Sequence, residues 1–173
     1  MIFVTVGTHE QPFNRLIKEI DKLAKDNNIR DNFFIQTGFS DYHPQNCKWS
    51  KFLSYKEMNE YTKRARIIIT HGGPASFIAP LELGKIPIVV PRQKKFNEHI
   101  NDHQVEFVKQ IDNKIGNIIP VYDIKELRNA IIDYNDLTKC LYGKIHSNNS
   151  EFNNRLSKIV DDLLGEKYGK HKK

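Results

Sequence analysis

The residues best suited to chemistry in this sequence form the segment His71-Gly72-Gly73-Pro74. Two adjacent glycines allow a tight turn and a close approach of a ligand to the backbone. Pro74 favours the first turn of a helix, and the free amides of such a turn attract phosphate oxygens. Ser76 adds a hydroxyl donor. The segment therefore predicts an anion site, although glycines at such a turn can also serve packing alone.

Two other polar segments follow short apolar runs. Gly7-Thr8-His9 comes after Ile2–Val6, and Gln36-Thr37-Gly38 comes after Phe33-Phe34-Ile35. If both runs are parallel strands, their carboxyl ends lie at one edge of a sheet, where ligands bind. His9 then has three possible roles, as a general base, as a donor to phosphate or as a turn residue.

The segment His99–Gln104 allows several interpretations. On a helix, His99 and His103 would share a face, as zinc ligands do, but no third ligand accompanies them, so we predict no metal. Short polar groups at the start of a helix, bound to sugar hydroxyls, fit the residue types better. A solvated helix end is the third possibility.

These segments need a scaffold, and the sequence predicts a parallel α/β sheet flanked by helices, because short apolar runs alternate with helical patterns. Two helix starts fit a capping box, Ser54 with Glu57 and Asp123 with Glu126. Gly84 fits the end of a helix. The expected strands cover residues 2–6, 33–35, 49–53, 66–70, 86–90 and 118–121, and the expected helices cover residues 13–24, 55–65, 74–83, 98–111, 127–131 and 152–164.

The composition is that of a globular protein, with 39% hydrophobic and 28% charged residues in 173. We expect one domain over residues 1–165 and a basic, flexible tail over residues 166–173. Two interpretations of the tail stay open: it is a solvated chain end, or its positive charges attract it to anionic lipid. The net charge of +6 is spread along the chain without a nucleic-acid-binding motif, so no nucleic acid is expected as a partner.

Other common enzyme classes lack their signatures here. The sequence has no P-loop lysine motif, no Gly-x-Ser-x-Gly elbow and no Gly-x-Gly-x-x-Gly fingerprint. Cys47 and Cys140 match no metal or redox spacing, and they are expected to be structural and inert.

Over roughly residues 1–135 the sequence resembles family 28 glycosyltransferases. Within that family it is similar to the catalytic subunits of split bacterial capsular and exopolysaccharide transferases, and to the corresponding subunit of the two-part dolichol-linked N-acetylglucosaminyltransferase. The motifs that carry the resemblance are Phe3-Val4-Thr5-Val6-Gly7-Thr8, Ile69-Thr70-His71-Gly72-Gly73-Pro74-Ala75-Ser76, Gly84-Lys85-Ile86-Pro87-Ile88-Val89-Val90-Pro91 and Asn97-Glu98-His99-Ile100-Asn101-Asp102-His103-Gln104.

The resemblance implies a single Rossmann-like domain, equivalent to the C-terminal, donor-binding domain of a GT-B transferase. The implied activity is an inverting transfer from a UDP-sugar, with galactose as the leading candidate, to a sugar linked to undecaprenyl diphosphate, in polysaccharide biosynthesis. The implied partner is a membrane-anchored, acceptor-binding subunit, without which the hexosyltransferase would be inactive. That partner would hold the chain at the cytoplasmic face of the cell membrane. No cofactor or obligatory metal is implied.

The same resemblance assigns site residues. The catalytic base is either His9 or a group of the partner subunit. Many family members carry an acidic residue that binds ribose in the helix after Gly-Gly. In this sequence Ala79 occupies that position, and Glu82 lies nearly a turn away. The alternative to a catalytic subunit is a non-catalytic subunit that enhances a partner transferase. The implied substrate-binding residues are Gly7 and Thr8 at the diphosphate, Phe52 and Leu53 at uracil, His71, Gly72, Gly73 and Ser76 at the phosphates and ribose, and Asn101, Asp102 and Gln104 at the sugar.

Overall fold

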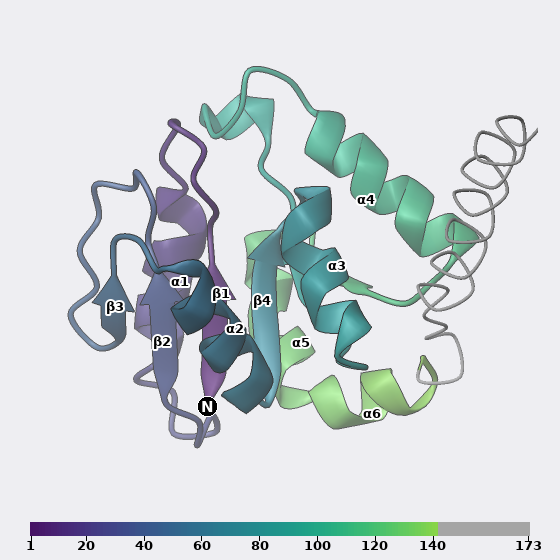
Figure 1. Cartoon of the computed structure of the whole chain (residues 1–173), viewed down its shortest axis with the longest axis horizontal. Coiled ribbons are helices and arrows are strands. Elements are labelled where there is room, and N and C mark those ends of the chain that lie inside the picture. Colours follow the sequence, from purple (N-terminus) through teal and green to yellow (C-terminus); the bar gives the residue numbers. More distant parts are fainter. Residues whose placement is uncertain (142–173) are drawn as a thin grey trace, which may run out of the picture.

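The computed structural model describes residues 1–141, which form one six-stranded parallel sheet with helices on both faces (Figure 1). The strand order is β3-β2-β1-β4-β5-β6, so the chain builds outward from β1 first to one side and then to the other. This arrangement confirms the predicted fold class. The strands are β1 (Ile2–Thr5), β2 (Phe33–Gln36), β3 (Lys48–Ser50), β4 (Ile67–His71), β5 (Ile88–Val90) and β6 (Ile119–Pro120).

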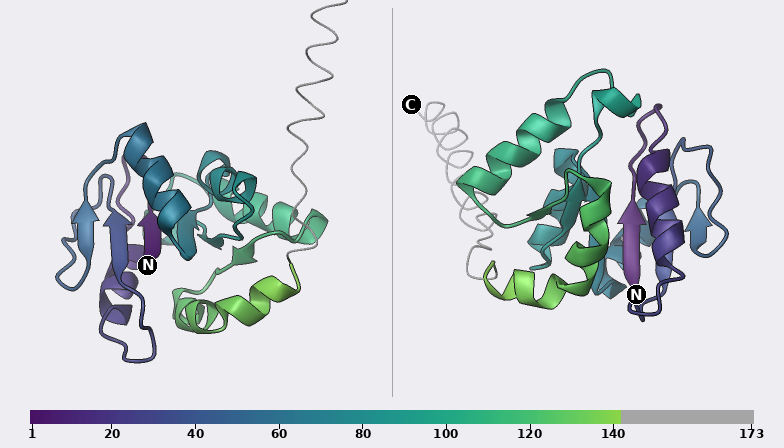
Figure 2. Two further views of the ribbon diagram at one scale, coloured as in Figure 1. Left: turned by 60° about the horizontal axis from the view of Figure 1, so that its bottom comes forward. Right: turned by 180° about the vertical axis from the view of Figure 1, so that it is seen from behind.

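The helices divide between the two faces of the sheet. Figure 2 shows α1 and α5 together behind the sheet in the view of Figure 1, whereas α2 and α3 cover the front and α4 lies across the upper corner. The helices are α1 (Asn14–Leu23), α2 (Tyr55–Arg64), α3 (Pro74–Glu82), α4 (His103–Lys114), α5 (Leu127–Ile132) and α6 (Tyr134–Lys139), with short 3-10 turns η1 (Lys94–Phe96) and η2 (Ile124–Glu126).

The alternation of side chains along β1 explains why both faces need cover. Ile2 and Val4 belong to the main core under α1 and α5, whereas Phe3 belongs to a separate cluster under α2. Phe3 stacks on Tyr61 of α2 with ring centroids 5.4 Å apart. Because successive residues of a strand point to opposite faces, an unbroken apolar strand indicates a sheet that is buried on both sides.

Most local predictions hold. Ser54 and Glu57 form the predicted capping box at the start of α2. Gly84 has a φ of 70° directly after α3, as the end of that helix requires. Asp123 accepts a hydrogen bond from the Lys125 amide and so caps η2, and the reciprocal bond from Glu126 that a capping box needs is not formed within the described residues.

The predicted start of the fourth long helix was wrong. We expected a helix from residue 98, but α4 begins at His103, and Asn97 has a left-handed φ of 56°. Glu98 is buried and its carboxylate binds Arg15 and the Gln93 amide, so it serves as an anchor for the loop. His99 therefore precedes the helix and does not share a helical face with His103.

The two edge strands of the sheet are also shorter than predicted. The third strand covers residues 48–50 where 49–53 was expected, and the last strand has two residues where four were expected. The helix α6 was not predicted. The helix expected at residues 152–164 and the tail at residues 166–173 lie outside the described residues. Within residues 1–141, none of the helices has the length and apolarity needed to cross a membrane.

Candidate functional site

A cavity of about 690 Å³ opens at the carboxyl ends of β1 and β4. Three segments that are distant in sequence form its wall: the loop after β1, the segment after β3, and the turn that joins β4 to α3. Their convergence follows from the topology, because β1 lies between β2 and β4 in a parallel sheet. The lining residues are Thr5, Gly7, Thr8, His9, Gln36, Phe52, Leu53, Met58, His71, Gly73, Pro74, Ala75, Ser76 and Gln104.

The structure brings most of the sequence-predicted site residues to this one cavity. Gly72 lies within the turn but not on the wall, and Asn101 and Asp102 are also outside the lining. Gln36 and Pro74, which the sequence placed at a polar strand end and at the start of a helix, also line the cavity. Thr5, Met58 and Ala75 were not predicted as site residues.

The glycines of this site make room for the protein's own His71 ring. A Cβ on Gly7 would lie 2.5 Å from His71 Nε2, and one on Gly73 would lie 2.3 Å from His71 Cε1. A Cβ on Gly72 would lie 3.0 Å from the Cβ of Gln104. The expectation that Gly72 and Gly73 open the backbone to a ligand is thus only half of the explanation, because side chains of the chain itself fill that space.

Two amides that were expected to face phosphate are already used. The Gly72 N–H donates to Gln104 Oε1 at 3.0 Å, and the Gly73 N–H donates to His71 Nδ1 at 3.0 Å. Pro74 has no N–H. Within residues 1–141, the amide of Ala75 has no hydrogen-bond partner, and it lies in the first turn of α3, where the helix dipole attracts anions.

The protonation state of His71 follows from these bonds. Nδ1 accepts a hydrogen bond and carries no proton. Burial, followed by the positive charge of Arg92, lowers the pKa of His71 to about 4, so the ring is neutral near pH 7. The single ring proton is then on Nε2, which donates to Ser76 Oγ at 2.6 Å. The hydroxyl proton of Ser76 is left free to bind a ligand oxygen.

The Gln36 side chain forms hydrogen bonds to two segments of the cavity wall. Its Oε1 accepts from the Thr5 hydroxyl at 2.6 Å, and its Nε2 donates to the carbonyls of Gly7 at 3.1 Å and Lys51 at 3.3 Å. One side chain thus joins the loop after β1 to the segment that carries Phe52.

Phe52 and Leu53 present an aromatic face and a backbone edge to the cavity. Phe52 is partly exposed and meets Phe39 edge to face, with centroids 5.2 Å apart. The Phe52 carbonyl accepts a hydrogen bond from the Ser50 hydroxyl at 2.8 Å. The Leu53 amide has no partner among the described residues, so it can donate to a heterocyclic base.

His9 lies on the cavity wall in a defined orientation. Gln11 donates from Nε2 to the Asn97 carbonyl at 3.4 Å, which leaves Oε1 to accept from His9 Nε2–H at 3.0 Å. In this arrangement His9 Nδ1 carries the lone pair and is the atom able to accept a proton. The ring also stacks on His99 with centroids 4.6 Å apart, and burial lowers the pKa of His99.

The predicted sugar-binding cluster is mainly engaged in holding its own loop. Asp102 Oδ1 accepts from the Lys94 amide at 2.9 Å, and Asn101 Oδ1 accepts from the His103 amide at 3.2 Å. Gln104 Oε1 accepts from the amides of Gly72 and Arg92, so only its Nε2 is left to donate into the cavity. Ala79 and Glu82 are both exposed and lie outside the cavity lining.

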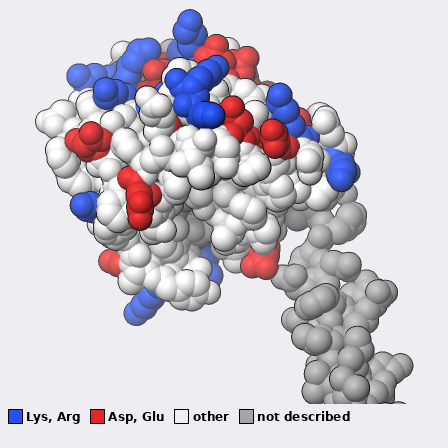
Figure 3. All heavy atoms as spheres, turned by 90° about the horizontal axis from the view of Figure 1, so that it is seen from above, with Lys and Arg blue, Asp and Glu red and all other residues white. Residues whose placement is uncertain are grey.

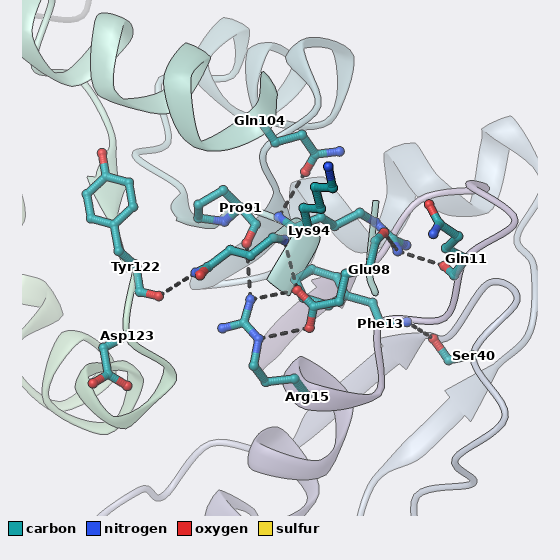
Figure 4. Close-up of polar contacts among 12 residues, drawn as sticks. Gln11, Phe13, Arg15, Ser40, Pro91, Lys94, Glu98, Gln104, Tyr122 and Asp123 are labelled. Atoms are coloured by element: carbon teal, nitrogen blue, oxygen red, sulfur yellow. Dashed lines mark hydrogen bonds and ion pairs between the residues drawn. The ribbon is translucent and has the colours of Figure 1, made fainter. Parts of the chain in front are cut away.

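A buried arginine, Arg92, binds backbone carbonyls of two loops near the site, next to the contact between Arg15 and Glu98 that Figure 4 shows. Arg92 is 1% exposed, and it donates to the carbonyls of Val6 at 2.8 Å, Gln11 at 2.7 Å and Glu98 at 3.1 Å. Burial lowers the pKa of Arg92 to about 10, which still leaves it charged near neutral pH. The carboxylate of Glu98 binds Arg15 through two bonds of 2.8 and 2.9 Å. The loop after β1 and the loop after β5 are thereby fixed to each other.

Residues 1–141 include potential metal ligands and two free thiols, those of Cys47 and Cys140. That part of the chain contains no group of three or more His, Cys, Asp or Glu residues able to hold a metal ion. Burial, followed by the charge of Asp21, raises the pKa of Cys47 to about 12. Cys140 is exposed and unpaired by any disulfide.

Solved structures share this fold. The glycotransferase of kitacinnamycin superimposes with a TM-score of 0.62 at 13% identity, over 93% of this chain and 42% of that chain. The glycosyltransferase SnogD from Streptomyces nogalater superimposes with a TM-score of 0.53 at 14% identity, over 83% of this chain and 39% of that one. The chain therefore shares the fold of one part of these two glycosyltransferases, and it spans less than half the length of each.

The sequence defines the family. Residues 1–161 match the Glycosyltransferase family 28 C-terminal domain, and the chain belongs to that family. It is also 33% identical over 119 residues to the human UDP-N-acetylglucosamine transferase subunit ALG13, an alignment that covers 64% of this chain and 10% of the human protein. The resemblance drawn from the sequence motifs is confirmed.

Proposed function

We propose that this chain is the donor-binding, catalytic subunit of a two-component inverting glycosyltransferase. It transfers a hexose from a UDP-sugar, with galactose as the leading candidate, to a sugar on a lipid diphosphate such as undecaprenyl diphosphate. The observation that carries the proposal is the single cavity where the loop after β1, the Phe52–Leu53 segment and the His71–Ser76 turn converge. Family membership and the description of human ALG13 as a transferase subunit support it.

The cavity offers suitable groups for each part of UDP. Uracil would lie against Phe52, with the Leu53 amide at its edge. The diphosphate would take the Ala75 amide, the Ser76 hydroxyl and the N-terminus of α3. As the bond between the anomeric carbon and the UDP oxygen breaks, negative charge grows on the diphosphate, and these fixed donors stabilise it without an obligatory metal.

The acceptor hydroxyl must lose a proton as its oxygen attacks the anomeric carbon from the side opposite to UDP. His9 is the candidate base in this chain, because Gln11 holds its Nε2 proton and leaves the Nδ1 lone pair available. A base on the partner subunit is the alternative. Replacement of His9 by alanine should lower kcat by about 100-fold or more if His9 is the base. A kcat within about twofold of the wild type would assign the base to the partner.

The donor site is tested by calorimetry with UDP. Ser76→Ala should weaken UDP binding about tenfold, because it removes a hydrogen bond to a charged group. Thr138→Ala, which removes a hydroxyl on α6 far from the cavity, is the matched control. Equal UDP affinity in both variants would sink the site assignment. Gly73→Asp is a poorer test, since any Cβ there collides with the His71 ring.

A non-catalytic role is the competing function. In that case the chain would only stabilise or enhance a partner transferase that carries its own donor site. Transfer assays with radiolabelled UDP-sugars should use membranes that contain the acceptor-binding partner, with and without this chain. Loss of transfer with Ser76→Ala supports the catalytic role, whereas full enhancement by Ser76→Ala supports the alternative. Attachment to the cytoplasmic face of the membrane through the partner is part of the proposal, and cell fractionation with and without that partner tests it.

A further inference from the structure

A second cavity of about 670 Å³ lies at the carboxyl ends of β5 and β6. The helix α4 stands between the two cavities, with Gln104 on the wall of the first and Val105 and Lys109 on the wall of the second. Nothing in the proposed transfer reaction uses this second cavity. It has the same position relative to its strands as the first, at the edge of the sheet where parallel α/β folds bind ligands.

The wall of the second cavity is strongly basic. Arg15, Lys95, Lys109 and Lys125 line it, against the single carboxylate of Asp123. Among the described residues, none of the three lysines forms an ion pair with a carboxylate. Figure 3 looks down on this edge of the molecule and shows that charged side chains, lysine and arginine together with some Asp and Glu, gather along one side, whereas much of the other side is uncharged.

Two buried donors on this wall lack partners. Arg15 uses Nε and Nη2 to bind Glu98 and the Pro91 carbonyl, but its Nη1 and the hydroxyl of Tyr122 have no hydrogen-bond partner within residues 1–141. In Figure 4 the free nitrogen of Arg15 points away from Glu98, on the side where Tyr122 and Asp123 lie. Burial raises the pKa of Tyr122, so its hydroxyl keeps its proton. Buried donors without acceptors cost free energy, and an oxyanion in the cavity would remove that cost.

We propose that the second cavity is a binding site for a phosphate or diphosphate group. Several cations around one cavity favour an anion that carries more than one negative charge and several acceptor oxygens. A phosphate or diphosphate group has these properties, whereas a single carboxylate does not. Phe96 is half exposed and covers the Arg15 guanidinium at 4.7 Å, so an apolar part of the ligand has a surface to contact. The proposal does not depend on the proposed transferase function.

The test is a titration of the full chain with inorganic pyrophosphate, followed by amide chemical shifts at constant ionic strength. Saturable shifts are expected at Phe96, Lys109 and Tyr122, apart from any shifts at Ala75 in the first cavity. The variant Lys109→Glu/Lys125→Glu should weaken the pyrophosphate binding reported by the Phe96 and Tyr122 amides about tenfold or more. The control Lys56→Glu/Lys63→Glu makes the same change of net charge with exposed lysines of α2, and it should retain wild-type binding.

Equal weakening in the two double variants would overturn the proposal, as would shifts confined to the first cavity. Thermal melting of both variants checks that each is folded. Amide chemical shifts with UDP on the same proteins keep the two proposals separate, because Lys109→Glu/Lys125→Glu should leave the UDP-dependent shifts at Ala75 in the first cavity unchanged.

The phosphate can come from a free molecule or from a lipid headgroup. Sedimentation with phosphatidylglycerol vesicles, compared with phosphatidylcholine vesicles, distinguishes the two sources. A headgroup ligand is indicated if wild type and control sediment with the anionic vesicles, the Lys109→Glu/Lys125→Glu variant does not, and pyrophosphate releases the bound protein. A soluble ligand is indicated by pyrophosphate binding without vesicle binding. Failure of both probes overturns the site.

Discussion

The two cavities at the carboxyl edge of the sheet have similar volumes, about 690 and 670 Å³, but opposite chemistry. The first is lined without any Lys, Arg, Asp or Glu side chain, whereas four cations line the second. An anion in the first cavity must be held by backbone amides, a hydroxyl and a helix dipole that are fixed by the fold. An anion in the second is held by side-chain charges, three of which belong to exposed lysines. Fixed dipoles suit charge that develops during a reaction, and lysine charges suit capture of a charged group.

The loops that line the two cavities are joined by one network, formed by Arg92, Glu98 and Arg15. Loss of a member of this network should lower the free energy of unfolding more than any of the changes that follow. Arg92→Met leaves three carbonyls without their donor and removes the charge beside the loop after β1. We expect the free energy of unfolding to fall by about 3–5 kcal/mol, as for other buried charged networks that lose a member. Chemical denaturation measures it.

The control for Arg92 is Arg66→Met. Arg66 pairs with Asp31 at the surface, with 43% of its side chain exposed, and its loss should cost about 1 kcal/mol or less. If the two variants were equally stable, Arg92 would not be the support of the two loops, and the cavities would have to be held in place independently.

This network also marks the limit of what the sequence could reveal. Arg15 and Glu98 are 83 residues apart, and no local pattern links them. A polar residue ahead of an apolar helical pattern, such as Glu98, predicts a helix start, and only the tertiary partner shows that it is an anchor. The pairing of buried charges is a property of the folded chain, so the predicted helix began five residues too early.

Other parts of the site could be predicted because their causes are local or topological. The Ser54–Glu57 capping box depends on four consecutive residues, and the apolar strands depend on their own composition. The convergence of Gly7-Thr8-His9 with His71-Gly72-Gly73 follows from parallel strands, whose carboxyl ends meet at one edge. The role of the glycines could not be predicted, since it depends on where the His71 ring lies.

The neutrality of the first cavity can be tested through pH. The pKa of His71 is about 4 in the folded chain, against an ordinary value of 6.5. Between these values the unfolded chain binds a proton that the folded chain does not, so stability present above about pH 6.5 is lost as the pH falls toward 4. The loss attributable to His71 is up to about 3 kcal/mol.

The measurement is a series of urea denaturation curves from pH 7 to pH 4.5. His71→Asn should be less stable than the wild type at pH 7 but should lose less stability as the pH falls. The pKa of His99 is also lowered by burial and contributes a loss of the same sign, which remains in the variant. Parallel curves for the two proteins would mean that His71 is not held neutral in the folded chain.

The affinities of the two cavities for their ligands should also depend differently on salt concentration, although this difference is smaller than the preceding effects. Exposed charges are screened by ions more strongly than partly buried dipoles. Between 50 and 300 mM NaCl we expect pyrophosphate binding at the second cavity to weaken about fivefold, and UDP binding at the first to weaken less than about twofold. Amide chemical shifts at Tyr122 and Ala75, followed at the two salt concentrations, measure binding in each cavity separately. Equal salt dependence would contradict the distinction drawn between them.

The smallest expected effect is that of the Tyr122 hydroxyl, which is best seen by comparison with the hydroxyl of Tyr134. The Tyr134 hydroxyl donates to the Ile86 carbonyl at 2.7 Å, so Tyr134→Phe should lower the free energy of unfolding by about 1–2 kcal/mol. The Tyr122 hydroxyl is buried without a partner in the described part of the chain, so Tyr122→Phe should leave stability unchanged or raise it by up to about 1 kcal/mol. Thermal denaturation with saturating pyrophosphate then adds a sharper comparison. Because a ligand stabilises the state that binds it, the wild type should gain more in melting temperature than Tyr122→Phe does. A hydroxyl that costs stability in the free protein and contributes to it in the bound protein is one positioned for a ligand.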